Sequence, residues 1–207
     1  MARNVTATCR LCRRSGNKLM LKGTKCITKC TMDKRESPPG PQVSRRRRLS
    51  ERGIQLREKQ KARFIYGIME GQFRRLFEKA EKQPGITGDN LMVLLEKRLD
   101  NVVYRLGFAE SRAQARQLVS HGHILRNGRR TNIPSALVKE GDTISWRPES
   151  AKTEYYKALV QAIESRSIVN WLSLDKQNMV GRVVSLPTPD DLDTKIDGKA
   201  IVEYYSR

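Results

Sequence analysis

Residues 89–107, with the sequence DNLMVLLEKRLDNVVYRLG, decide how the central part of this chain folds. Apolar side chains recur there at steps of three and four, which is the spacing of one face of a helix. They are Leu91, Leu94, Leu95, Leu99, Val102, Val103 and Leu106. The stretch opens at Asp89-Asn90 and stops at Gly107, so it predicts one long amphipathic helix.

A second helix is expected after a short link of three residues. Ser111 is a good N-cap, Ala115, Leu118 and Val119 supply a buried side, and Gly122 offers a left-handed stop. The sequence therefore predicts a helix over residues 111–122.

A small sheet is predicted to follow this second helix. Residues 124–126 and 129–131 flank Asn127-Gly128, the dipeptide best suited to the positive φ angles of a tight hairpin turn. A third strand is expected over residues 143–147, after the turn at Gly141-Asp142. Residues 89–146 thus predict a compact α+β module of two helices packed on a small antiparallel sheet.

The polar sides of these helices suggest what the module binds. Arg112 and Arg116 lie one turn apart on the second helix, and Arg98 and Arg105 lie two turns apart on the first. Guanidinium groups match phosphate geometry, so RNA is the expected ligand. The predicted RNA-binding residues of the module are Arg98, Arg105, Arg112, Arg116, Gln117, His121, His123, Asn127 and Arg129.

The two histidines admit two interpretations. We expect His121 and His123 to cap the second helix and to face RNA. A metal site is the alternative, but no carboxylate or thiol lies near them in the sequence.

The same residues match a known family. The runs RLDNVVYRLGF (98–108), SRAQARQLV (111–119) and HGHI (121–124) closely resemble the RNA-binding domain named after bacterial small-subunit ribosomal protein four. The flanking runs REKQK (57–61), YGI (66–68), QFR (72–74), WLSLD (171–175) and EYYSR (203–207) resemble the same family. The resemblance covers nearly the whole chain and indicates the zinc-containing form of that family.

The distribution of charge points to a polyanion. The chain has 41 Lys and Arg against 22 Asp and Glu, a formal charge of +19. Residues 1–130 hold 31 basic and 11 acidic side chains, whereas the rest holds 10 and 11. A pI of about 10.2 favours nucleic acid over a neutral partner.

An anionic membrane is the rival partner for so basic a chain. No long apolar run or amphipathic anchor is present, so the sequence disfavours that partner. Residues 1–20 also lack the apolar segment of a signal peptide, and we therefore expect a cytoplasmic protein.

Four cysteines near the N-terminus predict a structural zinc site. Cys9 and Cys12 form one close pair and Cys26 and Cys30 another, with 13 residues between the pairs. Two thiolate pairs joined by a short loop suit tetrahedral zinc, and four thiolates leave no open position for catalysis. The alternatives are four unrelated thiols or two disulfides, and a reducing compartment disfavours the disulfides.

Basic residues surround this predicted zinc-bound head and continue beyond it. Eight lie among or just before the cysteines: Arg3, Arg10, Arg13, Arg14, Lys18, Lys22, Lys25 and Lys29. A proline-rich linker is expected over residues 36–44, directly before Arg45, Arg46, Arg47 and Arg48. Such a run is either a solvated charge block or a phosphate contact, and its basic neighbours favour RNA. Arg57, Lys59 and Lys61 on the following helix complete the predicted RNA-binding set.

Helices are predicted over residues 50–65 and 70–82, and aromatic residues of the second are expected in the core. A further helix over 153–165 is expected to bury Tyr156, Leu159, Val160 and Ile163. Extended runs are predicted at 171–174, 181–186 and 200–205, and the acidic residues Asp190, Asp191 and Asp193 predict a solvated loop or a protein-binding surface.

The predicted organisation has three parts. Residues 1–44 form the zinc-binding head and linker, 45–90 a helical domain, and 91–185 the RNA-binding module with the following helix and strands. The resemblance implies that the module is inserted into a mainly helical domain that the C-terminal tail, about residues 186–207, completes.

Three classes of function compete for this sequence. The resemblance implies the first, a structural protein of the small ribosomal subunit that binds the 5′ domain of the ribosomal RNA and nucleates assembly there. It also implies a place at the messenger RNA entry channel beside small-subunit proteins three and five, and a contribution to translational accuracy. An aromatic content of only 6% argues against recognition dominated by base stacking.

The rival class is an RNA-modifying enzyme or a tRNA synthetase that carries the same module. Arg98-Leu99-Asp100 superficially resembles the catalytic triplet of pseudouridine synthases, but it lies within an amphipathic helix, and the chain lacks room for a separate catalytic domain. A third class, a small heat-shock or ribosome-recycling factor with this module, would not need the cysteine head. No enzymatic activity is therefore expected.

Overall fold

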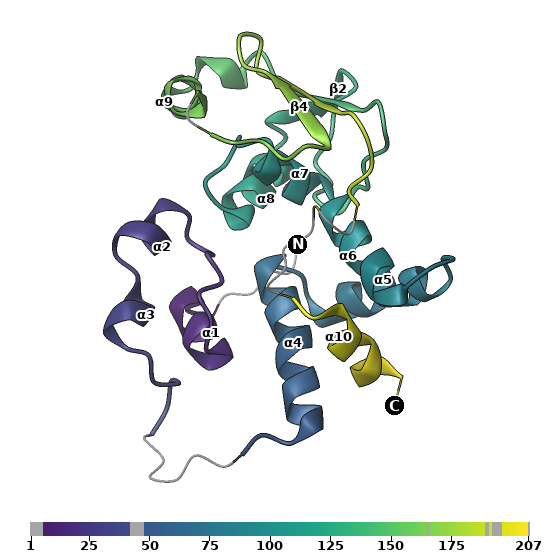
Figure 1. Cartoon of the computed structure of the whole chain (residues 1–207). Coiled ribbons are helices and arrows are strands. Elements are labelled where there is room, and N and C mark those ends of the chain that lie inside the picture. Colours follow the sequence, from purple (N-terminus) through teal and green to yellow (C-terminus); the bar gives the residue numbers. More distant parts are fainter. Residues whose placement is uncertain (1–5, 42–47, 165, 189–190, 192–195, 207) are drawn as a thin grey trace. The chain divides into compact units, whose positions relative to one another are not determined.

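The computed structural model describes residues 6–41, 48–164, 166–188, 191 and 196–206. The chain forms two compact units (Figure 1). The first unit comprises Met1–Met92 and Asp193–Arg207, and the second comprises Val93–Leu192. An α+β fold is confirmed, because helices dominate the first unit whereas the second contains a sheet.

Helices make up the first unit where the structure describes it. They are α1 (Thr8–Ser15), α2 (Thr24–Thr28), α3 (Thr31–Lys34), α4 (Glu51–Ile65), α5 (Glu70–Glu81), the start of α6 (Thr87–Glu96) and α10 (Gly198–Tyr205). The predicted helices at 50–65 and 70–82 are confirmed as α4 and α5. Ser50 caps α4, because its side chain accepts a hydrogen bond from the backbone N–H of Gly53. Phe73 and Phe77 are buried in the core, as expected.

The extended run predicted at residues 200–205 is wrong, because these residues belong to α10. Asp197 starts this helix, since its carboxylate accepts hydrogen bonds from the backbone N–H groups of Lys199 and Ala200. Figure 1 shows α10 beside α4, where Gln55 Nε2 donates to Glu203 Oε2 at 2.9 Å. The tail therefore completes the helical unit by side-chain packing that strand propensity does not detect.

The second unit combines helices with a sheet. Its helices are α7 (Leu99–Arg105), α8 (Arg112–Ser120), the 3-10 turn η1 (Ser150–Lys152) and α9 (Glu154–Ile163). Its strands are β1 (Ile124–Arg126), β2 (Arg129–Arg130), β3 (Thr143–Trp146), β4 (Leu172–Asp175) and β5 (Val180–Val183). These strands pair antiparallel in the order β2-β1-β3-β5-β4, so the predicted antiparallel sheet is confirmed.

Local signals around α8 and the first hairpin are confirmed. Ser111 caps α8 by accepting from the backbone N–H of Gln114, and Gly122 has a φ of 74° after the helix ends. Asn127 and Gly128 both have positive φ, at 50° and 74°, as a two-residue hairpin turn requires.

The prediction of a single helix over residues 89–107 is wrong, because the helix is interrupted between α6 and α7. Arg98 is extended, with φ −70° and ψ 138°, and pairs with Leu137 in an isolated β-bridge. The backbone N–H of Leu99 donates to the carbonyl of Ala136 at 2.8 Å, and that of Val138 donates to Lys97 at 2.9 Å. These long-range hydrogen bonds replace helical ones, and the apolar spacing alone does not reveal them.

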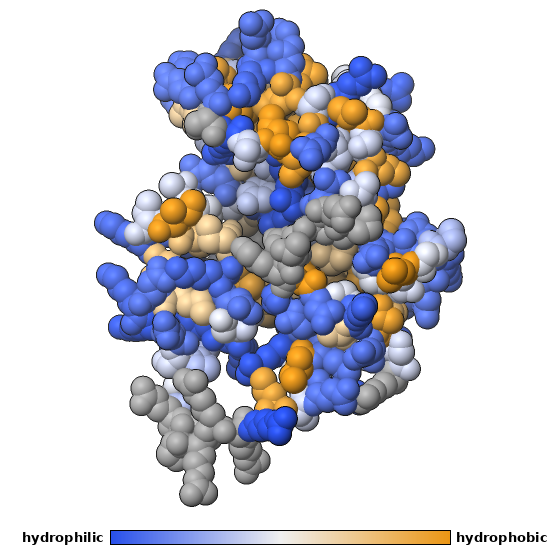
Figure 2. All heavy atoms as spheres, in the orientation of Figure 1, coloured by the Kyte–Doolittle hydropathy of each residue, from blue (hydrophilic) through white to orange (hydrophobic). Residues whose placement is uncertain are grey.

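The core of the second unit lies between α7, α8, α9 and the sheet. Leu106, which ends α7, is fully buried against Gly181 on β5. Leu118 is only partly buried, and Val160, predicted to be buried, is 37% exposed. On the face drawn in Figure 2, hydrophilic side chains cover most of the surface and apolar ones form small groups. Among the described residues, no helix is long and apolar enough to cross a membrane.

Candidate RNA-binding surface and cysteine pocket

Arg98 does not lie on the polar face where the sequence placed it. Its side chain is buried, with Nε 3.0 Å from Oδ1 of Asp100 and Nη2 2.8 Å from Oδ2. The break before α7 turns this residue inward, so the prediction of an exposed Arg98 is wrong. The two-point ion pair gives Arg98 a structural task at the start of α7.

Glu96, a fully buried carboxylate, gathers the neighbouring polar groups. Arg105 donates to both of its oxygens, with Nε at 3.0 Å and Nη2 at 2.8 Å. The amide of Asn101 donates to the same carboxylate at 2.7 Å, and Arg112 Nη2 lies 3.8 Å away. We call Glu96, Arg98, Asp100, Asn101, Arg105, Arg112 and Arg116 the arginine network.

Arg112 and Arg116 reach this network from α8. Arg112 Nε donates to Oδ1 of Asn101 at 2.7 Å, and its guanidinium lies 4.6 Å from the centre of the Tyr104 ring. Arg116 Nη1 lies 3.6 Å from Oδ2 of Asp100. Four guanidinium groups thus share two carboxylates, which leaves the network with an excess of positive charge. Ion pairs fix these side chains in place, and such preorganised N–H groups suit phosphate binding.

Gln117 and His121 are exposed on or just after α8, and Arg129 is exposed on β2. His121 is the C-cap residue of α8, as expected, whereas His123 lies beyond the helix and is half-buried. The side-chain amide of Asn127 forms hydrogen bonds within the hairpin region. Its Nδ2 donates to Asp142 at 2.7 Å, and its Oδ1 accepts from the backbone N–H of Thr143 at 2.8 Å. The structure therefore gives Asn127 a turn-forming task.

Sequence reasoning missed Arg130 and Arg147, which lie near the two histidines. Adjacent residues of a strand point to opposite faces, so the predicted Arg129 and the omitted Arg130 cannot share one orientation. The repeated Arg-Arg after Asn-Gly was the available signal. Glu96 was missed as well, because an acidic residue in an apolar helix gives no sign of its partners.

The predicted contacts in the first unit divide into exposed and buried groups. Arg57 and Arg48 are exposed, whereas Arg45, Arg46 and Arg47 lie outside the described residues. Lys59 is buried, with Nζ 2.7 Å from Glu70 Oε1 and 4.5 Å from the centre of the Tyr204 ring. Lys61 is buried as well and pairs with Glu58 at 2.8 Å. The expectation that Lys59 and Lys61 lie open to RNA is therefore wrong. Lys59 joins α4 to α5, whereas Lys61 pairs within α4 itself.

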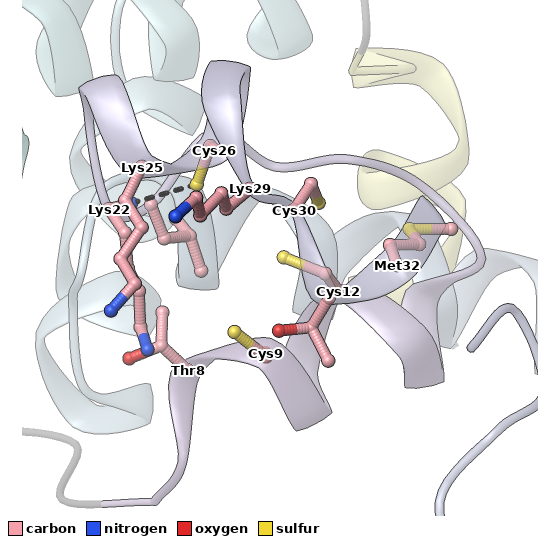
Figure 3. A pocket seen from close by; sticks show the side chains of 11 residues that line it. Thr8, Cys9, Cys12, Lys22, Lys25, Cys26, Lys29, Cys30 and Met32 are labelled. Atoms are coloured by element: carbon pink, nitrogen blue, oxygen red, sulfur yellow. Dashed lines mark hydrogen bonds between the residues drawn. The ribbon is translucent and has the colours of Figure 1, made fainter. Parts of the chain in front are cut away.

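The four cysteines line one pocket of about 30 Å³, which α1 and the segments around α2 and α3 form (Figure 3). All four are free thiols, so the two-disulfide alternative finds no support. The backbone N–H of Lys22 donates to Cys26 Sγ at 3.2 Å. A hydrogen bond from Thr31 lowers the pKa of Cys9, and burial raises the pKa of Cys12. Among the described residues, however, no three His, Cys, Asp or Glu side chains converge closely enough to hold a metal ion.

Comparison with known proteins gives a consistent result along the whole chain. Residues 3–96 match the family described as ribosomal protein S4/S9 N-terminal domain, and residues 97–144 match the S4 domain. The small ribosomal subunit protein uS4 of Dehalococcoides mccartyi is 58% identical over 207 residues, all of both chains. The proteins of the same name from Halothermothrix orenii and Pelotomaculum thermopropionicum are 53% and 54% identical, again over the full length of each chain.

Proposed function

The chain belongs to the family of small ribosomal subunit protein uS4, and on this basis we propose that it is a structural component of the cytoplasmic small ribosomal subunit that binds ribosomal RNA directly. The observation that carries the proposal is the match over the full length, which includes the head, the module and the tail. Relatives of this name are ribosomal proteins, so no enzymatic activity is assigned. Asp100 is buried against Arg98, which further disfavours the synthase-like alternative.

The distribution of charge supports direct RNA binding. Residues 1–130 carry the excess of basic side chains, and Arg105, Arg112 and Arg116 lie together in the arginine network. Double-helical RNA is recognised through shape and phosphate position, which calls for several guanidinium groups at fixed distances. A network held by Glu96 and Asp100 would supply that array with little ordering of side chains on binding.

Sedimentation offers a simple test of the proposed role. The tagged protein should sediment with small subunits at moderate salt and leave them at high salt, since phosphate contacts weaken as salt rises. A protein that stays at the top of the gradient at every salt concentration would contradict the proposal.

We extend the proposal to the place of the protein within the subunit. By its family, the chain would bind the 5′ domain of the RNA, nucleate assembly there, lie beside proteins three and five, and touch messenger RNA at the entry channel. The exposed Arg48 and the basic run before it support a messenger contact through charge alone. A photoreactive amino acid in place of Arg48, which leaves the four natural cysteines intact, would report by crosslinking which RNA lies nearest.

We also propose that Cys9, Cys12, Cys26 and Cys30 hold one structural zinc ion. Support comes from the donor set: four free thiols around one small pocket, one of which accepts a backbone N–H hydrogen bond. Zinc would supply no reaction chemistry and would stabilise the head. Elemental analysis of protein purified without added metal should give about one zinc per chain. Absence of metal with four freely titrating thiols would refute the zinc site without touching the RNA proposal.

A further inference from the structure

Four potentially cationic side chains gather where α8 passes into β1. His121 ends the helix and His123 lies just before the strand, with ring centres 6.0 Å apart. Arg130 comes from β2, and its Nη2 donates to the carbonyl of His121 at 3.5 Å. Arg147 follows β3, and its backbone N–H donates to the carbonyl of His123 at 2.9 Å. We call these four residues the histidine cluster.

Gly122 leaves room for the guanidinium group of Arg130. A Cβ added to Gly122 would lie 2.3 Å from Nε of Arg130 and 2.9 Å from its Cζ, so the guanidinium rests against the glycine backbone. Gly122 also has a φ of 74°, which L side chains rarely adopt. The glycine that ends α8 thereby lets Arg130 approach both histidines.

Ser150 fixes the orientation of His123. Its Oγ lies 2.9 Å from Nδ1 of His123, and the serine is buried. The backbone N–H of Ser150 donates to Arg147, and its carbonyl accepts from the Thr153 hydroxyl. A hydroxyl can donate or accept, so His123 keeps this contact whether its ring is neutral or protonated. Because the serine engages Nδ1, Nε2 is the ring nitrogen that would meet a ligand.

The charges around His123 disfavour its protonated form. Burial lowers the pKa of His123, and the positive charges of His121, Arg130 and Arg147 lower it further. Glu149 brings an acidic group to the cluster, and its carboxylate pairs with Arg147. An anion placed between the rings and the arginines would oppose every one of these positive charges, and would therefore favour the imidazolium.

We propose that His121, His123, Arg130 and Arg147 form a binding site for a phosphate group of the RNA backbone, and that phosphate binding there is coupled to proton uptake by His123. This proposal rests on the proposed RNA-binding function. Linkage fixes the direction: the phosphate raises a histidine pKa that was low in the free protein, so affinity for RNA rises as pH falls. The effect is confined to the pH range between the free and bound pKa values.

The experiment uses the full chain and full-length small-subunit ribosomal RNA. The chain has only two histidines, His121 and His123, so NMR follows both signals without overlap from others. Calorimetry in buffers of different ionisation enthalpy measures the protons taken up on binding. We expect wild type to take up a fraction of a proton at about pH 6.5, and to bind about threefold to tenfold more tightly at about pH 6 than at about pH 8.

RNA bases can also take up protons, so variants are needed to distinguish proton uptake by the histidines from proton uptake by the RNA. His123→Gln and the double variant His121→Gln/His123→Gln should bind at high pH but lose most of the pH dependence and the proton uptake. Arg75→Gln is the matched control, because Arg75 is exposed on α5 of the other unit, lies outside the predicted RNA-binding set, and its loss should leave the proton uptake unchanged.

Three results would overturn the proposal in distinguishable ways. RNA binding with the same proton uptake in wild type and the double histidine variant would refute the coupled site and leave the proposed function standing. Histidine signals that respond to inorganic phosphate but not to RNA would show a site for free phosphate. No preference for ribosomal RNA at any pH would refute the proposed function and this site together.

Discussion

The guanidinium of Arg105 is held by both carboxylate oxygens of Glu96, at 3.0 and 2.8 Å. Glu96 is fully buried, whereas the Arg105 side chain is 19% exposed. A buried carboxylate of this kind fixes the cation from within and leaves its outer edge toward solvent. The arginines of α7 and α8 thus serve the fold and the proposed RNA contact at the same time.

Glu96→Ala should lower the free energy of unfolding of the second unit by about 3–5 kcal/mol, because it leaves Arg105 and Asn101 without their buried partner. Both tryptophans, Trp146 and Trp171, lie in this unit, so their fluorescence during urea unfolding reports it selectively. Lys157→Ala, which removes an exposed ion pair with Glu154, is the control and should change stability by less than about 0.5 kcal/mol. Equal effects of the two variants would contradict the organising role of Glu96.

Leu106 and Gly181 should behave as a coupled pair. A Cβ on Gly181 would lie 2.4 Å from Cδ1 of Leu106, so Gly181→Ala should cost about 1–3 kcal/mol through overpacking. Leu106→Ala should cost about 2–5 kcal/mol through the cavity it leaves. The double variant should lose less than the sum, since the new methyl group enters that cavity. Strict additivity in the same fluorescence assay would show that α7 and β5 are not packed this way.

Acid should weaken the helical unit through Glu70. Burial alone would raise the pKa of Glu70, but hydrogen bonds from Lys59 and Tyr205 hold that pKa below 4.5. A lowered carboxylate pKa gives stability that is present above the unfolded value and is lost as pH falls through the folded one. Urea unfolding followed by circular dichroism should therefore show a smaller decrease in stability below pH 4.5 for Glu70→Gln than for wild type.

Tyr205→Phe isolates one contact of the same cluster. It keeps the ring that lies 4.6 Å from Phe77 but removes the hydroxyl that donates to Glu70 at 2.8 Å. We expect a loss of about 0.5–1.5 kcal/mol near neutral pH. An unchanged stability would place Tyr205 in apolar packing alone.

The run from Arg45 to Arg48 should matter for structured messengers. Replacing all four with Ala should leave the fold intact, and subunits rebuilt with this variant should translate a messenger with a stable hairpin at the entry site more slowly than a hairpin-free messenger. Four cations are lost there, and phosphate contacts weaken with them. Equal slowing of both messengers would remove the proposed entry-channel role and leave a general assembly role.

Local sequence signals predicted the structure correctly where a single residue type determines the local backbone geometry. Ser111 predicted the cap of α8, and Asn127-Gly128 predicted the hairpin, because capping and positive φ depend on the residue type itself. The break at Arg98 could not be predicted in this way, since it depends on hydrogen bonds to residues near 136 that are distant in the sequence.

The candidate RNA-binding residues show the same difference between features that the sequence predicts and features that depend on distant contacts. Helical spacing placed Arg112 and Arg116 on one side of α8, yet it could not reveal that Glu96 and Asp100 hold them. Charge alone also suggested that Lys59 lies at the surface, although Glu70 and two tyrosine rings enclose its amine. A basic composition predicts a polyanionic partner, but only the fold shows which basic residues face outward and which pair within the protein.

The proposed RNA-binding function is tested most directly by the binding of the refolded full chain to naked small-subunit ribosomal RNA. In the presence of excess unrelated structured RNA, we expect a saturable complex whose log affinity falls linearly with log salt. Arg112→Ala/Arg116→Ala, checked for folding by tryptophan fluorescence, should weaken this complex by about 1–3 kcal/mol per lost contact and flatten the salt slope. A complex that unrelated RNA displaces equally well, or a double variant with unchanged affinity and slope, would contradict it.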